Sequence, residues 1–600
     1  MVQTQVAEPP SRAGCVSGGN PANRQRFCAT RNSLKRIVNP FLGRLNFGSR
    51  AGAVLVLFAA TAAFLPAQTF TTVFNFNDID TDGSQPEAAL VQASNGDLYG
   101  TTTVGGANGD GTVFKMTTNG TLTTLHSFCA QSGCPDGQFP YAGLVQAANT
   151  DFYGTTGYGG VNNSGTVFKI TPGGTLTTLY NFCSLSGCAD GSLPEAALVQ
   201  ATNGDLYGTT TYGGANNGGT VFKVTPGGTL TTLYSFCSLG GANCTDGANP
   251  YGGLVQATNG DLYGTTQYGG ASPFGSNGVG GTVFKITPGG TLTTLYSFCT
   301  QGTQGGEDCP DGDNPYAGLV QAANGDLYGT TWYGGANCVP QFGCGTVFKI
   351  TPSGTLTTLY NFCAQGVWPN CPDGSNPLDA ALVQATNGDL YGTMLSGGAN
   401  GSGMVFKITP GGTFTTTYSF CSLANCADGG FPFAGLAQAT NGDLYGVTSE
   451  FGATLLGGTI FKITPSGTLT TLYSFCAQSG CPDGEYPLEG LIQDTNGTLY
   501  GTTPYGGANG YGTIFSLSVG LGPFVETQTT AGKVGAHVKI LGTDLTGATS
   551  VSFNGTAAAF TVVSPSLITT TVPAGATTGK VEVATPSGTL STYVPYRVRP

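Results

Sequence analysis

Aspartates that recur in one sequence context are the side chains of this chain best suited to chemistry. Each is followed by glycine and, after two further residues, by proline. Such carboxylates gathered on one face could concentrate cations, bind hydroxyl-rich ligands or transfer protons. The alternative is structural, because Asp accepts backbone hydrogen bonds in turns and Gly adopts a positive φ there. The aspartates are Asp82, Asp136, Asp190, Asp246, Asp311, Asp373, Asp428 and Asp483.

The loop before Gly83 has the pattern closest to a metal site. Asp78, Asp80 and Asp82 stand at alternate positions before a glycine, as in calcium-binding loops. The twelfth position holds Ala89 in place of a bidentate glutamate, and this loop lacks the cysteine pair of its sister loops. One prediction is therefore calcium bound by these three carboxylates, and the other is a solvated acidic turn.

Aromatic residues stand at the start of the glycine-rich loops. Aromatic rings beside Asn and Asp suit sugar binding, because a ring offers a flat apolar face and the polar groups bind hydroxyls. Packing within or between sheets is the alternative. The residues are Tyr158, Tyr212, Tyr268, Trp332, Tyr333, Phe451 and Tyr505.

A histidine-based catalytic site is not expected. The chain has 2 histidines, and His126 occupies a position that tyrosine fills in sister repeats, while His537 lies in an expected strand. A Ser-His-Asp arrangement or a multi-histidine metal centre is therefore not available. The Gly-Gly turns lack the Lys and Ser/Thr of a phosphate loop. We predict no enzyme activity and no cofactor besides the calcium considered above.

Sixteen of the 18 cysteines fall into local pairs. The spacing within the pairs varies, which a metal site or a redox motif would not tolerate and a loop staple would. We predict eight local disulfides, and these require an oxidising compartment. The predicted pairs are Cys129 with Cys134, Cys183 with Cys188, Cys237 with Cys244, Cys299 with Cys309, Cys338 with Cys344, Cys363 with Cys371, Cys421 with Cys426 and Cys476 with Cys481.

The Asp-Gly aspartates, the loop aromatics and seven of the cysteine pairs occupy recurring places in a repeated unit. In one copy, residues 197–202, 205–212, 220–225 and 229–236 are rich in Val, Thr, Tyr and Phe and are bounded by Asn-Gly, Gly-Gly or Pro-Gly turns. This is the signature of antiparallel strands joined by hairpins. Four strands per repeat are typical of a β-propeller. The phrase Asn-Gly-Asp-Leu-Tyr-Gly or a close variant begins at Asn95, Asn149, Asn203, Asn259, Asn324, Asn387, Asn441 and Asn496.

The two ends of the array complement each other. The last unit has three expected strands, at 491–495, 498–505 and 513–518, whereas residues 69–76 have the sequence of a fourth strand alone. If 69–76 completes the last unit, the array closes and no sheet edge is left free. The predicted fold class is all-β: an eight-bladed β-propeller over 69–518, closed by its N-terminal strand and followed by a small immunoglobulin-like β-sandwich.

The order of Asn-Gly-Asp-Leu-Tyr and Phe-Lys-Ile-Thr-Pro-Gly-Gly in the unit resembles NHL-type propeller repeats. More closely, it resembles the GloVer tandem repeat of exported bacterial proteins. The resemblance covers residues 69–518 and all eight copies. It implies secretion or surface anchoring, and no particular activity.

The composition changes after a linker at 519–522. Short alternating stretches at 533–541, 550–553, 558–563, 567–572, 579–584 and 591–598 predict a β-sandwich over 523–600. The phrases Gly-Ala-His-Val-Lys-Ile-Leu-Gly and Val-Ser-Phe-Asn-Gly in it resemble the IPT/TIG immunoglobulin-like domain. In exported bacterial proteins that domain is similar to spacer and adhesion modules.

Residues 1–67 have the pattern of a basic leader and an export signal. The first 50 residues hold eight Lys and Arg against one acid, and an apolar run at 51–65 precedes the small residue Ala67. The run is shorter than the roughly 20 residues of a membrane-spanning helix. We expect a secreted or cell-surface protein with no spanning segment unless the signal stays uncleaved.

The composition excludes several classes of protein. Charged residues make up 9% of the chain, which excludes long helices and coiled coils, and the net charge of −12 disfavours nucleic acid as a partner. The predicted function is a non-catalytic exported binding or scaffold protein that presents loops to a glycan or a surface protein. The alternatives are a carboxylate-based polysaccharide hydrolase or lyase and a ligand-free structural envelope component.

Overall fold

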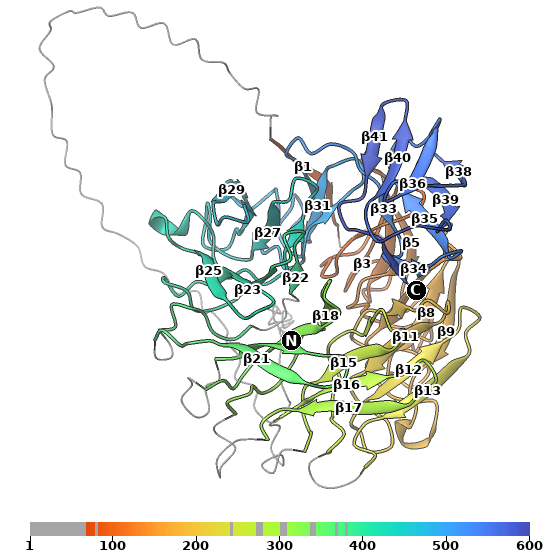
Figure 1. Ribbon diagram of the computed structural model, residues 1–600, viewed down its shortest axis with the longest axis vertical. Helices are drawn as coiled ribbons and strands as arrows, with labels where there is room; N and C mark the ends of the chain where they lie inside the picture. The colour runs from red at the N-terminus through yellow and green to blue at the C-terminus, as the bar shows by residue number, and fades with distance from the viewer. Residues whose placement is uncertain are drawn as a thin grey trace, which may run out of the picture. The chain divides into compact units, whose positions relative to one another are not determined.

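The computed structural model describes residues 68–77, 82–239, 244–271, 280–300, 309–336, 344–366, 370–377 and 382–599. This part of the chain is an all-β fold of four-stranded antiparallel sheets (Figure 1). The helical content of the described residues is two 3₁₀ turns, η1 (Ser186–Cys188) and η2 (Ala424–Cys426). The predicted leader and export signal at 1–67 lie outside the described residues.

Seven internal repeats each form one sheet in which the strands follow chain order. The second strands are buried throughout, and the third strands are buried except at one lysine. The fourth strands contain half-buried and exposed residues and no fully buried one, because each of them is the edge strand of its sheet.

The first strands are β2 (Val91–Gln92), β6 (Val145–Gln146), β10 (Val199–Gln200), β14 (Val255–Gln256), β18 (Val320–Gln321), β22 (Val383–Gln384), β26 (Ala437–Gln438) and β30 (Ile492–Gln493). The second strands are β3 (Leu98–Thr102), β7 (Phe152–Thr156), β11 (Leu206–Thr210), β15 (Leu262–Thr266), β19 (Leu327–Thr331), β23 (Leu390–Met394), β27 (Leu444–Thr448) and β31 (Leu499–Thr503). The third strands are β4 (Thr112–Met116), β8 (Thr166–Ile170), β12 (Thr220–Val224), β16 (Thr282–Ile286), β20 (Thr346–Ile350), β24 (Met404–Ile408), β28 (Thr459–Ile463) and β32 (Thr513–Ser518). The fourth strands are β5 (Leu122–Ser127), β9 (Leu176–Asn181), β13 (Leu230–Ser235), β17 (Leu292–Ser297), β21 (Leu356–Asn361), β25 (Phe414–Ser419) and β29 (Leu469–Ser474).

The first strands are shorter than the sequence predicted. In the copy expected to pair over 197–202, only Val199 and Gln200 pair with β11. The reason is the Asn-Gly turn that follows, because Ala201 N–H already donates to the Asp205 carbonyl at 2.9 Å and Gly204 N–H to the Ala201 carbonyl at 2.9 Å. These backbone groups are therefore not available to a longer ladder.

The N-terminal strand β1 (Thr69–Asn75) supplies the fourth strand of the last sheet, whose order is β1-β32-β31-β30. Its pairing with β32 is antiparallel and contains a bulge between Thr72 and Phe74, at the place where the other fourth strands also shift register. Phe76 N–H then donates to the Gly512 carbonyl at 3.0 Å, as Phe128 N–H does to Gly111 in the first repeat. The predicted pairing of 69–76 with the last repeat is confirmed.

Apolar clusters lie between consecutive sheets, and one of them joins the last sheet to the first. That cluster brings Phe76 and Ile514 of the last sheet against Leu98 and Phe114 of the first, all fully buried. Burying such side chains is the main stabilising contribution in a β fold. The first and last sheets of the array are therefore in direct contact.

A glutamine from each first strand also links neighbouring sheets. Its Oε1 accepts a hydrogen bond from the backbone N–H that follows the first strand of the preceding sheet, and the last of these bonds joins the eighth sheet to the first. The pairs are Ser94–Gln146, Ala148–Gln200, Thr202–Gln256, Thr258–Gln321, Ala323–Gln384, Thr386–Gln438, Thr440–Gln493 and Thr495–Gln92, at 2.7 to 3.0 Å.

The C-terminal module contains two four-stranded sheets, ordered β33-β35-β39-β38 and β37-β36-β40-β41, and a parallel pair, β34-β42. Its core includes Val525, Ile540, Phe553 and Val583. Two predicted strands are divided in the structure: 533–541 into β34 and β35, with the turn at Gly535 between them, and 591–598 into β41 and β42. The strands are β33 (Glu526–Thr527), β34 (Ala531–Lys533), β35 (His537–Leu541), β36 (Ser550–Phe553), β37 (Thr556–Ala558), β38 (Phe560–Ser564), β39 (Leu567–Thr571), β40 (Val581–Thr585), β41 (Gly588–Ser591) and β42 (Arg597–Arg599).

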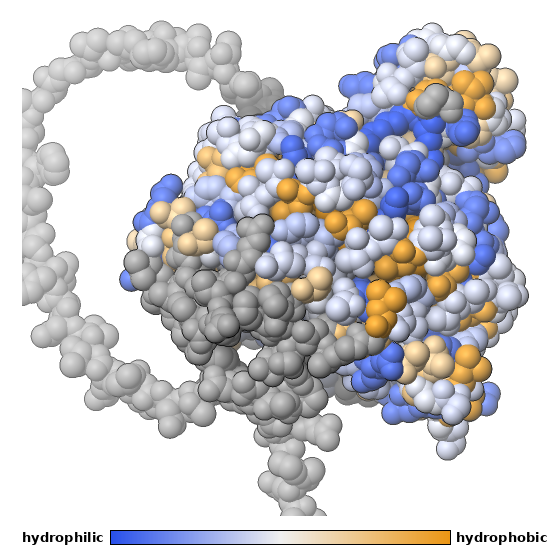
Figure 2. Space-filling view, turned by 60° about the horizontal axis from the view of Figure 1, so that its bottom comes forward, coloured by the Kyte–Doolittle hydropathy of each residue, from blue (hydrophilic) through white to orange (hydrophobic). Residues whose placement is uncertain are grey.

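The surface carries separate apolar patches with polar side chains between them (Figure 2). Among the described residues, no helix has the length and the apolar character that a membrane crossing requires.

Candidate ligand-binding face

The Gly-Gly loops and the Asp-Gly loops lie together on one face, which we call the loop face. In the third sheet, Ser192 of an Asp-Gly loop forms a β-bridge with Tyr212 of a Gly-Gly loop, and in the second sheet Gln138 forms the same bridge with Tyr158. Gly160 N–H also donates to the Cys134 carbonyl at 2.8 Å. The two kinds of loop are therefore joined to each other within a sheet.

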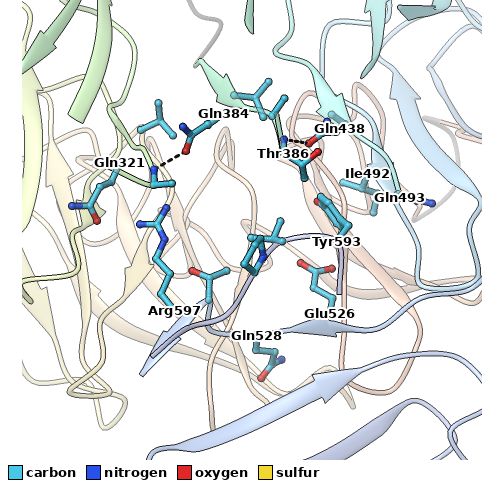
Figure 3. Close-up of a pocket in the computed structure, with 18 of the residues that line it drawn as sticks. Gln321, Gln384, Thr386, Gln438, Ile492, Gln493, Glu526, Gln528, Tyr593 and Arg597 are labelled. Atoms are coloured by element: carbon cyan, nitrogen blue, oxygen red, sulfur yellow. Dashed lines mark hydrogen bonds between the residues drawn. The ribbon is translucent and has the colours of Figure 1, made fainter. Parts of the chain in front are cut away.

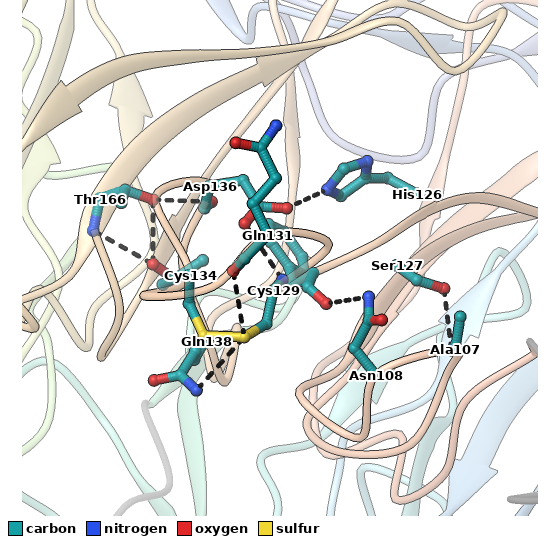
Figure 4. A network of polar contacts seen from close by, with 12 residues as sticks. Ala107, Asn108, His126, Ser127, Cys129, Gln131, Cys134, Asp136, Gln138 and Thr166 are labelled. Carbon is teal, nitrogen blue, oxygen red and sulfur yellow. Dashed lines mark hydrogen bonds and ion pairs between the residues drawn. A yellow bond between two sulfur atoms is a disulfide. The ribbon is translucent and has the colours of Figure 1, made fainter. Parts of the chain in front are cut away.

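Seven of the Asp-Gly aspartates accept hydrogen bonds from groups of their own repeat, and Figure 4 shows one of them, Asp136, with His126 and Cys129. Asp190 accepts hydrogen bonds from Tyr180 Oη at 2.8 Å and from the Ser184 and Leu185 N–H groups at 2.9 and 3.2 Å. The same pattern of a fourth-strand side chain and loop N–H donors holds at the other copies. These are Asp136, Asp246, Asp311, Asp373, Asp428 and Asp483.

The donors lower the pKa of some of these aspartates, among them Asp190 and Asp428, whereas at Asp311 burial outweighs the donors and raises the pKa. Burial acts to raise the pKa of Asp190, but the hydrogen bonds from Tyr180, Ser184 and Leu185 outweigh it and lower that pKa. The pKa of Asp428 is lowered in the same way. The glycine that follows is also required, because Gly191 has φ 103° and a Cβ there would overlap Thr210 Oγ1. The interpretation as turn acceptors is confirmed, and ligand binding by these carboxylates stays a prediction.

Seven of the eight predicted disulfides join described cysteines, each closing its own small loop on the loop face. The closed loop is described throughout in four of them: Cys129 with Cys134, Cys183 with Cys188, Cys421 with Cys426 and Cys476 with Cys481. In the other three the bonded cysteines are described and part of the loop between them is not: Cys237 with Cys244, Cys299 with Cys309 and Cys363 with Cys371.

The eighth predicted pair includes Cys338, which lies outside the described residues, and its expected partner Cys344 is disulfide-bonded. Groups of cysteine and acidic side chains close enough to hold a metal do occur, but the cysteines in them are disulfide-bonded. The sulfur atoms of these groups are therefore held in disulfides. Cys244 and Cys309 belong to no such group within the described part of the chain.

The second cysteine of a pair does more than the predicted stapling, as Cys244 and Cys309 show. The Cys244 carbonyl accepts hydrogen bonds from Gly247 N–H at 2.7 Å and from Gly270 N–H at 2.9 Å. The Cys309 carbonyl accepts in the same way from Gly312 at 3.0 Å and from Gly335 at 2.8 Å. Each of these cysteines therefore ties its Asp-Gly loop to the Gly-Gly loop beside it, and neither offers its sulfur to a ligand.

The predicted calcium loop falls largely on undescribed residues. Asp78 and Asp80 lie outside the described part of the chain. Asp82 is described, and its backbone carbonyl accepts a hydrogen bond from Thr112 Oγ1 at 3.4 Å, as the carbonyl of Asp136 does from Thr166. Calcium binding at this loop remains a prediction.

An array of aromatic rings crosses the loop face over the third to fifth sheets. Tyr212 Oη lies 3.3 Å from Tyr251 Oη, and Tyr251 stacks on Tyr316 with centroids 4.9 Å apart. Tyr316 meets Trp332 edge to face at 6.2 Å, and Trp332 stacks on Tyr333 at 4.5 Å. All five rings are half-buried, so part of each remains accessible. We call this set the aromatic array.

Acidic side chains border the aromatic array. Burial raises the pKa of Asp313 to about 7, although the N–H of Gly280 donates to its Oδ1 at 2.6 Å. The charge of Asp313 in turn contributes to the raised pKa of Tyr333, for which burial is the larger cause. Burial also raises the pKa of Glu195, which accepts a hydrogen bond from Thr211 Oγ1 at 3.1 Å.

The remaining predicted aromatics are distributed over other sheets. Tyr158 is 37% exposed and lies edge-on to Phe139. Phe451 stacks on Phe431, and Tyr505 lies edge-on to Tyr486 at 6.2 Å. Burial and the charges of Tyr212, Tyr333 and Asp313 raise the pKa of Tyr268, which places its hydroxyl close to the array. The predicted set is therefore not one continuous surface.

Two members of the array, Tyr251 and Tyr316, were not predicted from the sequence. Both directly follow the proline that closes an Asp-Gly loop, and Tyr141 and Glu195 hold the same position in other repeats. The signal was present in the phrase Asn-Pro-Tyr. It could not be interpreted alone, because these residues meet the Gly-Gly loops only in the folded sheet array.

The basic residues of the repeats lie away from the loop face. Residues 68–518 contain seven, all lysines of third strands. Each pairs with the aspartate of an Asn-Gly-Asp turn, as Lys462 does with Asp443 at 3.5 Å. The other pairs are Lys115–Asp97, Lys169–Asp151, Lys223–Asp205, Lys285–Asp261, Lys349–Asp326 and Lys407–Asp389. The loops of the repeats consequently carry only negative formal charges.

A cavity of about 1290 Å³ lies between the first strands and the C-terminal module (Figure 3). Its walls include Val320, Leu382 and Ile492 of the repeats, and its floor includes Glu526 and Arg597 of the module. The module is held there by hydrogen bonds, among them Lys539 Nζ to the Ala148 carbonyl at 2.6 Å and Ser566 Oγ to the Ser94 carbonyl at 2.9 Å. No pattern in the sequence indicated this cavity.

Comparison with known proteins finds two families. Residues 41–271, 184–308, 281–515 and 367–558 match the Gloeobacter/Verrucomicrobia repeat, and residues 523–598 match the IPT/TIG domain. A search of curated proteins finds no match.

Solved structures resemble the chain only weakly. A fungal alcohol oxidase of the AA5 family, solved with copper, is 13% identical with a TM-score of 0.38, and the match covers 86% of this chain and 98% of that one. A putative 6-phosphogluconolactonase from Bacteroides fragilis is 17% identical with a TM-score of 0.38, over 66% of this chain and 96% of that one.

Proposed function

The chain belongs to the Gloeobacter/Verrucomicrobia repeat family and ends in an IPT/TIG domain, and from this premise we propose that it is a non-catalytic surface or secreted protein that binds a glycan. The loop face is the binding surface, and the C-terminal module spaces or anchors it. The repeat and the module are both consistent with a binding role.

The proposal includes a closed ring of eight four-stranded blades. Three contacts between the ends of the array support closure: the pairing of β1 with β32, the buried cluster around Phe76 and Phe114, and the hydrogen bond from Thr495 to Gln92. A closed ring holds its loops at fixed positions on one face, as a repeated binding surface needs.

The aromatic array is the observation that carries the proposal. Trp332 and Tyr333 are stacked on each other and half-buried, so their positions are set before any ligand arrives. Rigid aromatic rings lose little conformational entropy on binding, and their faces pack against apolar faces of sugar rings. The carboxylates of Asp313 and Glu195 nearby offer acceptors for sugar hydroxyls.

The charge of the loop face narrows the class of glycan. The loops of the repeats contain no lysine or arginine, and they carry many aspartates and glutamates. An anionic polysaccharide would be repelled by this field. We therefore propose a neutral or amine-bearing glycan as the ligand.

The proposed location is outside the cytoplasm. Seven disulfides of the described residues close loops on the binding face, and such bonds persist in oxidising compartments. The predicted export signal at 1–67 supports the same location.

A glycan array probed with the purified protein tests the proposal. We expect binding to neutral or amine-bearing polysaccharides, and binding lost or reduced at least tenfold in Trp332→Ala. Tyr158→Ala is the matched control, because it removes an exposed loop-face aromatic outside the array. Equal binding by both variants, or binding to anionic glycans only, would refute the assignment. Shortened chains in product analysis of a bound glycan would refute the non-catalytic part.

A further inference from the structure

Three polar side chains of the C-terminal module project into the cavity beneath the first strands. Glu526, Tyr593 and Arg597 point upward from the module toward the glutamines of the repeats (Figure 3). They are brought there by the start of β33, the segment before β42, and β42 itself. The cavity is thus polar on the side of the module.

Three charged side chains of the module line the cavity, and two of them, Glu526 and Arg597, have no charged partner among the described residues. Within the described part of the chain, neither the Glu526 carboxylate nor the Arg597 guanidinium takes part in a hydrogen bond or ion pair, and the two do not pair with each other. The Glu526 side chain is exposed in the cavity, and the protein around it raises its pKa by partial burial. Burial lowers the pKa of Arg597, and Nε of neighbouring Arg599 is buried without a hydrogen bond.

Unpaired charges in a confined site are costly to hold, so complementary charges from a ligand would be strongly favoured. A carboxylate would pair with Arg597, whose planar fork can donate two parallel hydrogen bonds. An ammonium group would pair with Glu526. Because the two protein groups occupy separate places on the floor, one ligand must carry both charges at a distance from each other.

The walls of the cavity favour a ligand that has both apolar groups and carbonyl groups. Val320, Leu382 and Ile492 present apolar surface. Above them, the Nε2 atoms of Gln384 and Gln438 each donate one hydrogen bond, to the Gly388 and Gly442 carbonyls at 3.0 Å. An amide nitrogen has two hydrogens, so one donor of each glutamine remains for a carbonyl group.

We propose that this cavity binds a short apolar peptide with free ends. Its terminal carboxylate pairs with Arg597, its terminal ammonium with Glu526, its carbonyl groups accept from the glutamines, and its side chains pack on the valine and leucine walls. The volume of about 1290 Å³ is ample for a few residues. This site is separate from the loop face and does not depend on glycan binding.

Equilibrium dialysis of the full chain against a mixture of tripeptides built from Leu, Val and Ala tests the proposal, with mass spectrometry to identify what is retained. We expect retention of free-ended tripeptides, and at least tenfold weaker binding when both ends are blocked by acetylation and amidation. Arg597→Gln should weaken at least tenfold the binding of tripeptides with a free carboxyl end and leave the binding of C-amidated tripeptides unchanged. Glu526→Gln should weaken at least tenfold the binding of tripeptides with a free amino end and leave the binding of N-acetylated tripeptides unchanged.

Lys580→Gln and Glu582→Gln are matched controls, because they remove charges of the same module outside the cavity and should bind as the unaltered chain does. The melting temperature reports whether each variant is folded. Arg597→Lys, which keeps the charge and loses the fork, replaces Arg597→Gln if the latter does not fold. The proposal would be overturned if no tripeptide is retained, or if the cavity variants bind free and blocked peptides as the unaltered chain does.

Discussion

The backbone N–H of Thr495 donates a hydrogen bond to Oε1 of Gln92 at 3.0 Å, across 403 positions of sequence. Seven further bonds of the same kind join consecutive sheets, so the first and last sheets are connected as any two neighbours are. Gln92 also donates to Asp494 and to Thr495 Oγ1. One glutamine per repeat thus contributes at every junction between sheets.

Removing that glutamine should weaken the junction between the ends of the array. Gln92→Ala leaves the Thr495 N–H without its acceptor, and we expect a loss of about 1–3 kcal/mol in the free energy of unfolding. Urea unfolding measures it. Gln256→Ala, at an internal junction, is the comparison. If Gln256→Ala lowers the free energy of unfolding and Gln92→Ala does not, the first and last sheets are not held together by this hydrogen bond.

The aspartate of the Asp-Gly loop should act as a stability switch at acid pH. Asp428 accepts from Tyr418 Oη at 2.8 Å and from the Ser422 and Leu423 N–H groups, and Asn in its place offers fewer acceptors. We expect Asp428→Asn to cost roughly 2–3 kcal/mol at neutral pH. Asp443→Asn, which removes the turn ion pair with Lys462 and alters the hydrogen bond from Asn441 Nδ2, should cost less than about 1 kcal/mol.

The sign of the pH dependence follows from the lowered pKa of Asp428. Folding lowers the pKa of this carboxyl, so the ionised group stabilises the fold at any pH above its pKa in the unfolded chain. The stabilisation is lost as the pH falls through the pKa that the group has in the folded chain. The difference between the unaltered chain and Asp428→Asn should therefore narrow below about pH 4. Thermal melts from acid to neutral pH give the profile, and a constant difference would contradict this account.

Asp313 should show the opposite behaviour. Burial raises its pKa to about 7, so its ionised form disfavours the folded state. The unaltered chain should lose stability as pH rises from about 4 to 7, and Asp313→Asn should not. The variant should then be more stable at about pH 8 by up to roughly 3 kcal/mol and equal at about pH 3.5. Asn can still accept from Gly280, and a variant less stable at the higher pH would refute the prediction.

The small disulfides should contribute to stability one by one. Replacing Cys421 and Cys426 by serine opens one loop, and the chain-entropy treatment gives a cost of about 2–3 kcal/mol for so short a ring. Unfolding without reductant measures the effect. The same replacement should have no effect once all disulfides are reduced, and a difference that persists under reductant would place the effect in the packing of the sulfur atoms.

The sequence by itself determined the strands, the turns, the disulfides and the partner of β1, because each follows from local rules. Alternating side chains and turn residues set the strands, and a missing fourth strand identifies what must fill its place. The first strands are shorter than predicted because turn hydrogen bonds use their backbone groups. The C-terminal module divides two of the predicted strands and contains β33, which no predicted stretch covers.

The tertiary structure alone decided the surfaces on which ligands could bind. Tyr251 and Tyr316 join Trp332 because loops of neighbouring sheets meet. Glu526 and Gln438 line one cavity because the C-terminal module lies against the first strands. Such contacts are made by residues far apart in the chain. No periodicity or spacing in the sequence predicts which loops will lie side by side in the folded array of sheets.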